Sequence, residues 1–343
     1  MATERIQMII AKELEGQKAK LALEEHNSTA KKNNSFNPED LWLNKKGCPI
    51  GSVPIPKCRS KEQLQIVRNV GRAQYTSQKL DNHSYDGAPS HLDFAGLLVG
   101  NAPSGRFTGA RAIMTIWNPS LQGKNQYSSA SLYLEDGDNQ IRVGWIVHPA
   151  LYGDSRTRLF SRWTSDNYGK TGCYINHCPG FVITSNVVPL NYAFPQISVS
   201  RGEQFDVTLG VSKSSTGNWE FYYNDQKLGT WPSFIFSKMG ESASQLRFGG
   251  ECYEPENQGV SPQMGSGDKF KNGQYDRTAY MRQLRYSDSR DGDFDVNDAM
   301  VQVQMSRCYY AASQGYNSHD DWYRYSFMYG GMGGQDGARC FDL

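Results

Sequence analysis

Apolar and polar residues alternate in many short segments of the chain from about residue 110 onward. In the clearest segment, Ile141, Val143 and Trp145 occupy every second position and so share one face of a predicted strand. Arg142 and His148 then lie on the other face. Further segments of this kind cover residues 112–117, 205–211, 219–223, 246–251 and 301–305. Because no helical pattern separates them, we expect an all-β domain built as an antiparallel β-sandwich.

The same alternation predicts on which face of the sheet Glu251 lies. Leu246 and Phe248 occupy one face of their strand and Arg247 the other, and this parity carries Glu251 onto the Arg247 face. If the aliphatic faces form the core, Arg142 and Glu251 both point away from it. The two glycines that precede Glu251 are the place where a bulge would reset this register.

The chain before about residue 90 has a different pattern. Ile6, Ile9 and Leu14 recur at helical spacing, and a second helix is expected within residues 60–72. The next residues have little apolar content and are typical of a linker. We therefore predict three parts, namely a small, partly helical N-terminal segment at 1–72, a linker at 73–89 and the β-sandwich at 90–343.

Charge and hydropathy argue against two kinds of partner. The 36 Lys and Arg residues nearly balance the 35 Asp and Glu residues, which argues against a broad basic surface for nucleic acid. The chain has no apolar run of about 18 residues, so we expect no membrane-spanning helix. Residues 1–20 carry several charges and no apolar stretch, so no signal peptide is visible there.

The spacing of the 7 cysteines favours an exported protein. We expect three disulfides, which would close a short loop, tie down the C-terminal segment and cross-link the N-terminal segment: Cys173–Cys178, Cys308–Cys340 and Cys48–Cys58. Cys252 is then left over, either as a free buried thiol or as a sign that this pairing is wrong. We favour an exported protein whose leader is missing from this sequence. The alternative is a cytosolic protein with reduced thiols.

No motif predicts a metal ion or a cofactor. A zinc site at Cys173 and Cys178 would need two more ligands, and only His177 is adjacent. The acidic run at 291–298 lacks the glycine and the glutamate of an EF-hand loop, so we interpret it as a solvated turn. The glycines at 330–334 are not followed by the Lys and Ser/Thr of a phosphate-binding loop.

Longer sequence blocks are the most distinctive feature of the chain. They are Ile141-Arg-Val-Gly-Trp145, Leu151-Tyr-Gly-Asp154, Thr171-Gly-Cys-Tyr174, Cys178-Pro-Gly-Phe181, Arg247-Phe-Gly-Gly-Glu251 and Gln263-Met-Gly-Ser-Gly267. With these blocks the sequence resembles the neprosin family of plant secreted prolyl endopeptidases, over about residues 90–340. The unit that begins Cys48-Pro49 is similar to the end of that family's activation peptide.

The resemblance implies a β-sandwich related to fungal glutamic peptidases, with a removable N-terminal segment that acts as an intramolecular inhibitor. It also implies a secreted, extracellular or vacuolar setting, an acidic working pH, and peptide or protein substrates, including proline-rich ones. Catalysis in the family uses two glutamates across a cleft. The second corresponds to Glu251, whereas the first belongs to an Ile-Glu-Ala-Gly-Trp block. That block reads Ile141-Arg-Val-Gly-Trp145 here, so Arg142 occupies the position of the first glutamate.

This exchange changes the expected chemistry. Two-carboxyl hydrolysis needs one carboxylate to deprotonate water and one carboxylic acid to donate a proton. Arginine stays charged and holds its proton too firmly for either role, and it would pair with Glu251 and lower its pKa. We therefore expect a catalytically impaired protein that retains a peptide-binding groove. The aromatic residues expected to line this groove are Trp145, Tyr152, Trp163 and Tyr174.

Two alternatives stay open at this point. In the first, the protein is an active prolyl endopeptidase in which Glu251 is the base and Arg142 stabilises the oxyanion. Gln263 could position a water molecule or the oxyanion in either scheme. In the second and weaker alternative, the abundant aromatic residues belong to a carbohydrate-binding β-sandwich, although core packing is the simpler account of them.

Overall fold

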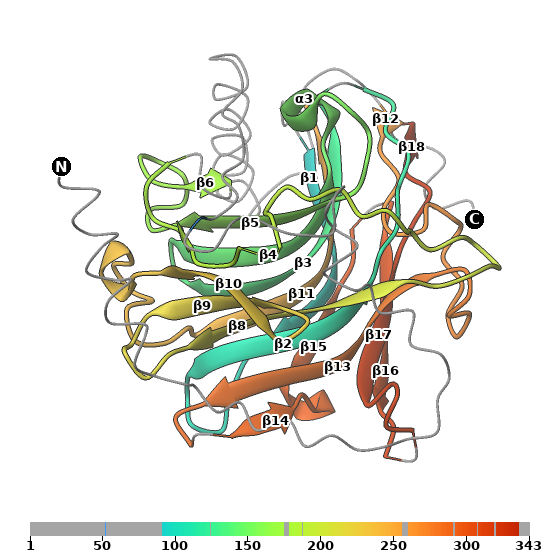
Figure 1. The fold of residues 1–343 in the computed structure, drawn as a ribbon. Coiled ribbons are helices and arrows are strands. Elements are labelled where there is room, and N and C mark those ends of the chain that lie inside the picture. The colour runs from blue at the N-terminus through green and yellow to red at the C-terminus, as the bar shows by residue number, and fades with distance from the viewer. Residues whose placement is uncertain are drawn as a thin grey trace.

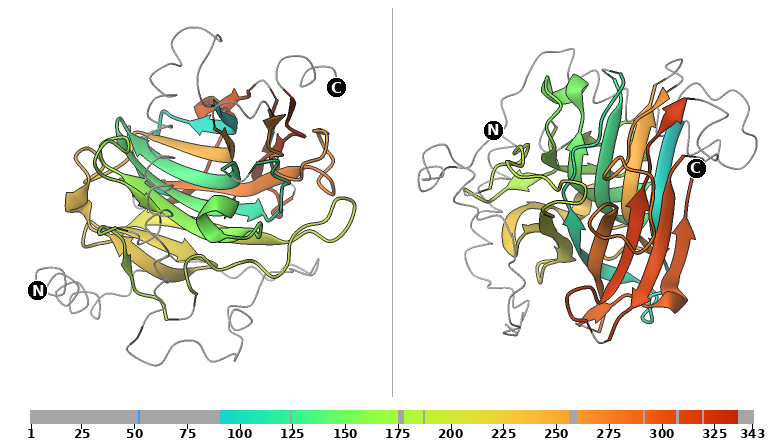
Figure 2. Two further views of the ribbon diagram at one scale, coloured as in Figure 1. Left: turned by 90° about the horizontal axis from the view of Figure 1, so that it is seen from above. Right: turned by 90° about the vertical axis from the view of Figure 1, so that its right-hand side faces the viewer.

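The computed structural model of the protein describes Ser52 and residues 91–335, apart from 124, 175–177, 187, 256–259, 291, 307 and 319. The predicted N-terminal segment and linker therefore lie outside the described residues, with the exception of Ser52. In the described residues nearly all regular structure is β, and two antiparallel sheets pack face to face (Figures 1 and 2). The predicted all-β sandwich is confirmed.

The first sheet, called sheet A, has seven strands. In spatial order they are β15 (Val301–Gln304), β1 (His91–Val99), β11 (Gln245–Glu254), β3 (Tyr127–Asp136), β4 (Asn139–Val147), β5 (Arg158–Thr164) and β6 (Cys173–Tyr174). A short helix, α3 (Pro149–Tyr152), follows β4 and ends at Gly153, whose φ of 78° is favourable only for glycine. Strands β4, β3 and β11 lie side by side and will carry the candidate site.

The second sheet, called sheet B, has nine strands. In spatial order they are β16 (Tyr310–Tyr316), β17 (Tyr325–Gly330), β13 (Ala279–Asp288), β2 (Phe107–Thr115), β8 (Asp206–Lys213), β9 (Trp219–Tyr223), β10 (Gln226–Trp231) and β7 (Val182–Ile183), with β14 (Asp293–Asp295) paired to β13. The remaining elements are the pair β12 (Val260–Ser261) and β18 (Gly334–Gln335) and the 3₁₀ turns η2 (Ser233–Ile235) and η3 (Asp298–Met300).

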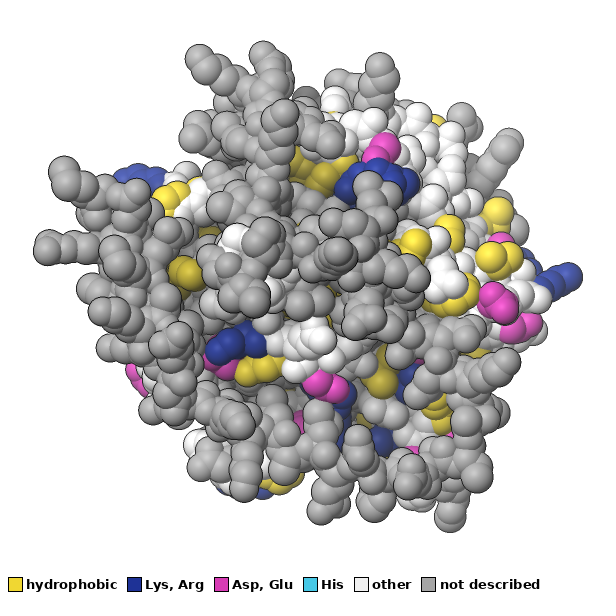
Figure 3. Space-filling view, in the orientation of Figure 1, with side chains coloured by type: hydrophobic (Ala, Val, Ile, Leu, Met, Phe, Trp, Pro, Cys, Tyr) yellow, Lys and Arg dark blue, Asp and Glu magenta, His cyan; other side chains and the backbone are white. Residues whose placement is uncertain are grey.

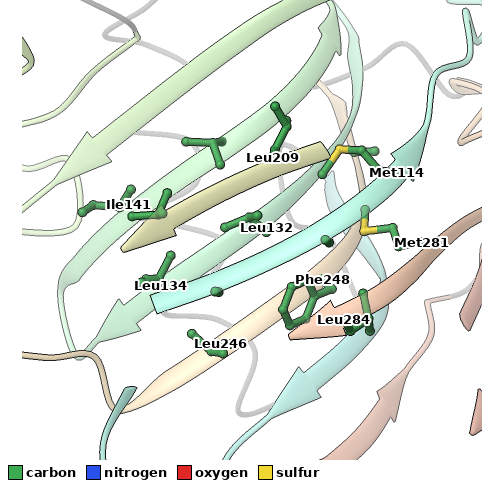
Figure 4. Packing of buried hydrophobic residues seen from close by; sticks show 14 of the residues in the cluster. Met114, Leu132, Leu134, Ile141, Leu209, Leu246, Phe248, Met281 and Leu284 are labelled. Carbon is green, nitrogen blue, oxygen red and sulfur yellow. The ribbon is translucent and has the colours of Figure 1, made fainter. Parts of the chain in front are cut away.

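The hydrophobic core lies between the two sheets (Figure 4). Sheet A contributes Leu132, Ile141 and Phe248, and sheet B contributes Met114 and Leu209, all fully buried. These side chains point inward from their strands, so each sheet covers the central inward face of the other. Full burial of a side chain of this size contributes roughly 1.5–3 kcal/mol.

The tight hairpin between β9 and β10 contributes to a pocket on sheet B that is described below. Its two turn residues, Asn224 and Asp225, have φ values of 42° and 65°. Asparagine and aspartate tolerate this conformation better than other non-glycine residues, and it matches the twist of a two-residue hairpin. Asn224 Oδ1 also accepts a hydrogen bond from Thr208 N at 3.0 Å, which ties the turn to β8.

Described charged side chains of opposite sign lie next to each other on the face shown in Figure 3. Elsewhere in the described chain, Arg324 forms an ion pair with Asp295, and Lys227 forms one with Glu220 at 3.1 Å. No helix among the described residues is both long enough and apolar enough to cross a membrane.

Candidate functional site

Arg142 and Glu251 face each other on the outer surface of sheet A. Arg142 lies on β4 and Glu251 on β11, and β3 runs between these two strands. The pairing of β11 with β3 continues from Gln245 to Tyr253 without a shift in register. The glycines before Glu251 therefore introduce no bulge there, and the predicted parity is correct. The Arg142 Nη1 group and the Glu251 Oε1 atom form an ion pair.

Small serines on β3 bind the rest of the Arg142 guanidinium. Arg142 Nε donates a hydrogen bond to Ser131 Oγ at 3.0 Å, and Arg142 Nη2 donates one to Ser129 Oγ. Each nitrogen of the guanidinium thus has a partner in the sheet. The side chain is held by two contacts to β3 and one to β11.

Tyrosine hydroxyls bind the Glu251 carboxylate. Tyr127 Oη donates to Glu251 Oε1 at 2.7 Å, and Tyr133 Oη donates to Glu251 Oε2 at 3.3 Å. Arg247 adds a second cation, with its Nη2 atom 3.9 Å from Glu251 Oε2. Both carboxylate oxygens are therefore in contact with donors, an arrangement that favours the ionised form.

The ion pair is buried, which sets the protonation states of its members. The side chains of Arg142 and Glu251 are 1% and 3% exposed. Burial by itself would raise the pKa of Glu251, but the Arg142 charge and the Tyr127 hydrogen bond outweigh it and hold this pKa below its usual value. Burial opposes the charge of Arg142 too, yet Glu251 raises the pKa of the guanidinium well above its usual value. The pair itself therefore consists of one fixed cation and one fixed anion.

A second cluster of buried side chains surrounds the ion pair on this outer face. It consists of Tyr127, Ile146, Leu151, Tyr152, Phe160, Tyr174 and Tyr253. The Arg142 guanidinium lies 4.8 Å from the Tyr133 ring centre and 5.1 Å from that of Phe160. Such cation–π contacts compensate part of the lost hydration of a buried guanidinium. Unlike the core between the sheets, this cluster mixes aromatic rings with charged groups.

His148 belongs to this neighbourhood and was not singled out from the sequence. Its ring lies 5.5 Å from that of Tyr127 and 6.4 Å from that of Tyr174. Both ring nitrogens are buried and, within the described part of the chain, neither makes a hydrogen bond. Burial, followed by the positive charge of Arg162, lowers the pKa of His148 to about 3, so the ring is neutral. The alternation of apolar and polar residues in the sequence did predict that His148 lies on the same face of the strand as Arg142.

A family model, neprosin, matches residues 124–332 of the chain. The protein belongs to the neprosin family. Among solved structures, a scytalido-glutamic peptidase bound to a transition state analog inhibitor is similar over 71% of this chain and 98% of that chain, at 10% identity and a TM-score of 0.40. SCP-B, a member of the eqolisin family of peptidases in complex with the tripeptide Ala-Ile-His, is similar over 71% of this chain and 98% of that chain, at 9% identity and a TM-score of 0.36. These values are too low to transfer residues or an activity.

The four aromatic residues that were predicted to line a groove in this neprosin-family protein lie in two different places. Tyr152 and Tyr174 lie on the Glu251 face, inside the aromatic cluster. Trp145 and Trp163 lie in the core between the sheets, so their assignment to a groove was wrong. The physical reason is parity, because both tryptophans share the inward face of their strands with aliphatic residues. The Trp145 ring also donates a hydrogen bond from Nε1 to Thr115 O at 2.9 Å.

Gln263 lies in the segment that follows β12, where it contacts the loop after β2. Its Oε1 atom accepts a hydrogen bond from Ser120 N at 2.9 Å, and Gln263 N donates to Ser120 O at 3.0 Å. Its carbonyl oxygen is also 3.5 Å from the Cys252 thiol, which points to the opposite face of β11 from Glu251. The described contacts thus give Gln263 an anchoring role and do not bring it to the ion pair.

Two of the predicted cysteine bridges involve residues that the structure describes. Cys178 and Cys308 are both disulfide-bonded. The side chain of Cys173 and all of Cys48, Cys58 and Cys340 lie outside the described residues, so the three pairings stay predictions. Cys252 is a free, buried thiol, the first of the two interpretations given above. Among the described residues, no group of three or more His, Cys, Asp and Glu side chains is arranged to hold a metal ion.

Proposed function

We propose that this protein binds peptide segments on the outer face of sheet A and is impaired in their hydrolysis. The observation that carries the proposal is the buried ion pair between Arg142 and Glu251. The family's two-carboxyl chemistry needs an acid and a base at these positions, and here one of the two carboxyl groups is replaced by a permanent cation.

The contacts of the two side chains argue against two catalytic roles, namely Glu251 as the base and Arg142 as the group that stabilises the oxyanion. Glu251 is a weak base because its anion is stabilised by Arg142 and by the Tyr127 hydroxyl. Arg142 is poorly suited to stabilise an oxyanion, because its three nitrogens already donate to Glu251, Ser129 and Ser131. The alternative of an active enzyme with Arg142 as the oxyanion group would have to break these contacts first.

Peptide binding is supported by the polar groups that border the ion pair. His148 and the Tyr174 hydroxyl are buried without a hydrogen-bond partner in the described chain, and unpaired groups of this kind gain from a bound peptide's N–H and C=O groups. Aromatic rings of Tyr127 and Tyr253 stack next to them at 5.4 Å. Since Glu251 is almost fully buried, a peptide reaches this face only after the groups packed over it move.

The family resemblance supports two further parts of this proposal. Residues 1–72 would act as the intramolecular inhibitor that limits access to this face. The protein would work in an oxidising compartment, outside the cell or in the vacuole, which suits the disulfides of Cys178 and Cys308. Segments that contain proline would be the preferred ligands.

An acid-pH cleavage assay with a quenched, proline-containing peptide tests the proposal on protein that is purified as the full chain and then freed by proteolysis of the residues before about 90, because the N-terminal segment would otherwise limit access to this face. We expect no turnover by the wild type. Arg142→Glu should gain turnover, because it places a carboxyl group next to that of Glu251. Arg142→Gln is the matched control, because it removes the cation without adding an acid, and it should stay inactive. Binding of the same peptide is measured separately by fluorescence anisotropy and should be detectable in the wild type.

Two results would contradict the proposal. The first is wild-type turnover that disappears in Glu251→Gln, which would show that the ion pair does not prevent catalysis. The second is the absence of peptide binding at any pH between 3 and 7 in both the wild type and Arg142→Glu. Folding of each variant is checked by circular dichroism before the assay.

A further inference from the structure

A small pocket lies on the opposite side of the molecule from the ion pair, on the outer face of sheet B. Its volume is about 140 Å³. Strands β2, β8, β9, β13 and β14 and the turn after β9 contribute the lining residues, which are Ala110, Arg111, Thr208, Gly210, Val211, Ser212, Tyr222, Asp225, Tyr286, Ser287 and Asp293. Nothing in the proposed peptide-binding function uses this pocket.

Gly210 opens the floor of the pocket, and the backbone does not require a glycine there. It lies in the middle of β8 and does not have a positive φ. A methyl group added at Gly210 would lie 3.5 Å from Ala110 O and 3.6 Å from Arg111 Cβ, which are ordinary contacts. The neighbouring Gly109 is different, because an added methyl group would overlap the Ser287 hydroxyl.

A glycine inside a strand is unfavourable by roughly 0.5–1 kcal/mol relative to alanine, and it often marks a place where a ligand approaches the backbone. Neither the backbone conformation nor close packing requires a glycine at position 210. We therefore ask what the space beside Gly210 could hold. The residues around that space indicate the kind of ligand.

The charged groups at the pocket neutralise each other in pairs. Arg111 Nη2 lies 3.4 Å from Asp225 Oδ1, and Arg285 Nη1 lies 2.9 Å from Asp293 Oδ2. Arg285 is not among the lining residues, so an anion would meet the carboxylates of Asp225 and Asp293, and a cation would meet the Arg111 guanidinium. A neutral ligand with several hydroxyl groups fits best, because hydroxyls both donate to carboxylates and accept from guanidinium groups.

The size of the pocket allows one six-membered ring to enter. An enclosed cavity of about 150 Å³ takes up benzene, and this pocket of about 140 Å³ is partly open, so the hydroxyl groups of a sugar ring can project beyond it. The Tyr222 side chain forms one wall and is fixed by a hydrogen bond from its hydroxyl to Glu220 Oε2 at 2.5 Å. Ser212 and Ser287 add hydroxyl groups at the floor.

We propose that this pocket binds one neutral sugar residue of a glycan, with a face of the sugar ring against Tyr222 and its hydroxyls between Asp293, Asp225 and Arg111. Gly210 is the specificity-determining position, because any side chain there would fill the space of the ring. The site would attach the protein to a glycan while the Glu251 face acts independently on the other sheet.

Saturation-transfer NMR and calorimetry on the full-length protein test this site. The probes are the methyl glycosides of glucose, galactose and xylose, together with xylotetraose and cellotetraose as uncharged oligosaccharides. We expect at least one probe to bind to the wild type, and its affinity to fall at least about tenfold in Gly210→Val and in Tyr222→Leu. Met305→Ala should bind the same probe as the wild type does, because Met305 is exposed and lies outside the pocket.

Three outcomes would overturn the proposal. They are no binding of any probe at 10 mM concentration, a roughly unchanged affinity in both pocket variants, and binding of arginine methyl ester in place of the sugars. If Gly210→Val does not fold, as judged by its melting curve, Ser212→Ala replaces it, because this variant removes a pocket hydroxyl without adding volume. The result is independent of peptide cleavage, so failure here leaves the proposed function untouched.

Discussion

The ion pair and the imidazole beside it show how single side chains determine the character of the Glu251 face. Arg142 satisfies its charge with Glu251 and two serines, so it is a fixed part of sheet A. His148 is the opposite case, because its ring is buried next to Arg162 with no hydrogen-bond partner in the described chain. A buried carboxylate that is paired with a cation stays ionised in mild acid. A buried neutral histidine loses its stabilising effect there, because protonation is favoured in the unfolded chain.

His148 should therefore make the protein less stable in acid. The pKa of about 3 in the folded state lies below the value of about 6.5 expected after unfolding, so the unfolded state binds more protons below pH 6.5. Stability contributed by neutral His148 is complete above that pH and is lost as the pH falls toward 3. Between pH 7 and 4.5 this amounts to about 2–3 kcal/mol.

The measurement compares urea unfolding of the wild type and His148→Phe at pH 7 and pH 4.5. Phenylalanine keeps an aromatic ring at this position but cannot bind a proton. The variant should therefore lose about 2–3 kcal/mol less stability than the wild type between pH 7 and pH 4.5. Equal losses in both proteins would show that His148 does not resist protonation.

Close strand packing explains why β4, β3 and β11 hold the site rigidly. Gly144 on β4 lies against β3, and a methyl group there would overlap Ala130 O and Ser131. Ser131 is one of the two serines that bind Arg142, so the glycine permits the approach on which that contact depends. On β8, in contrast, Gly210 has room for a methyl group.

Alanine substitutions at these two glycines should have opposite effects. Gly144→Ala should destabilise the protein by about 1–3 kcal/mol, because the backbone of β3 cannot yield without loss of pairing. Gly210→Ala should leave stability unchanged or raise it by up to about 1 kcal/mol. Chemical denaturation of both variants measures the difference, and a larger loss in Gly210→Ala would contradict the contact geometry.

The whole molecule has one shared core and two separate outer faces. The inward residues of both sheets form a continuous apolar cluster, while the Glu251 face and the sheet B pocket lie on opposite sides of it. Cross-links add to this core, since Cys178 and Cys308 are disulfide-bonded. Cys252 lies inside the core as a thiol, where burial raises its pKa to about 12.

Peptide mapping under non-reducing conditions should therefore give a defined cysteine pattern. We expect Cys173–Cys178, Cys308–Cys340 and Cys48–Cys58 as linked peptides. Cys252 should resist alkylation in the native protein, because it is buried and protonated, and should react after denaturation. Rapid labelling of native Cys252, or its recovery in a linked peptide, would contradict this assignment.

Much of the candidate site could be predicted from alternation alone. The period of two residues set the faces of Arg142 and Glu251, and the unbroken register preserved them. The same rule should have kept Trp145 and Trp163 out of the groove, because each shares parity with inward aliphatic residues. That error came from assigning aromatic residues to a binding surface by type, without regard to the face they occupy.

The sequence by itself determined the fold class and the family, and it predicts that Arg142 occupies the position of a catalytic glutamate. These depend on periodicity and on local blocks, which involve residues close together in the chain. The tertiary structure decided that Arg142 contacts Glu251, that His148 lies unpaired beside them, and that Gly210 opens a pocket. Those features arise from pairing between strands far apart in the sequence, and the spacing along the chain does not specify which strands become neighbours.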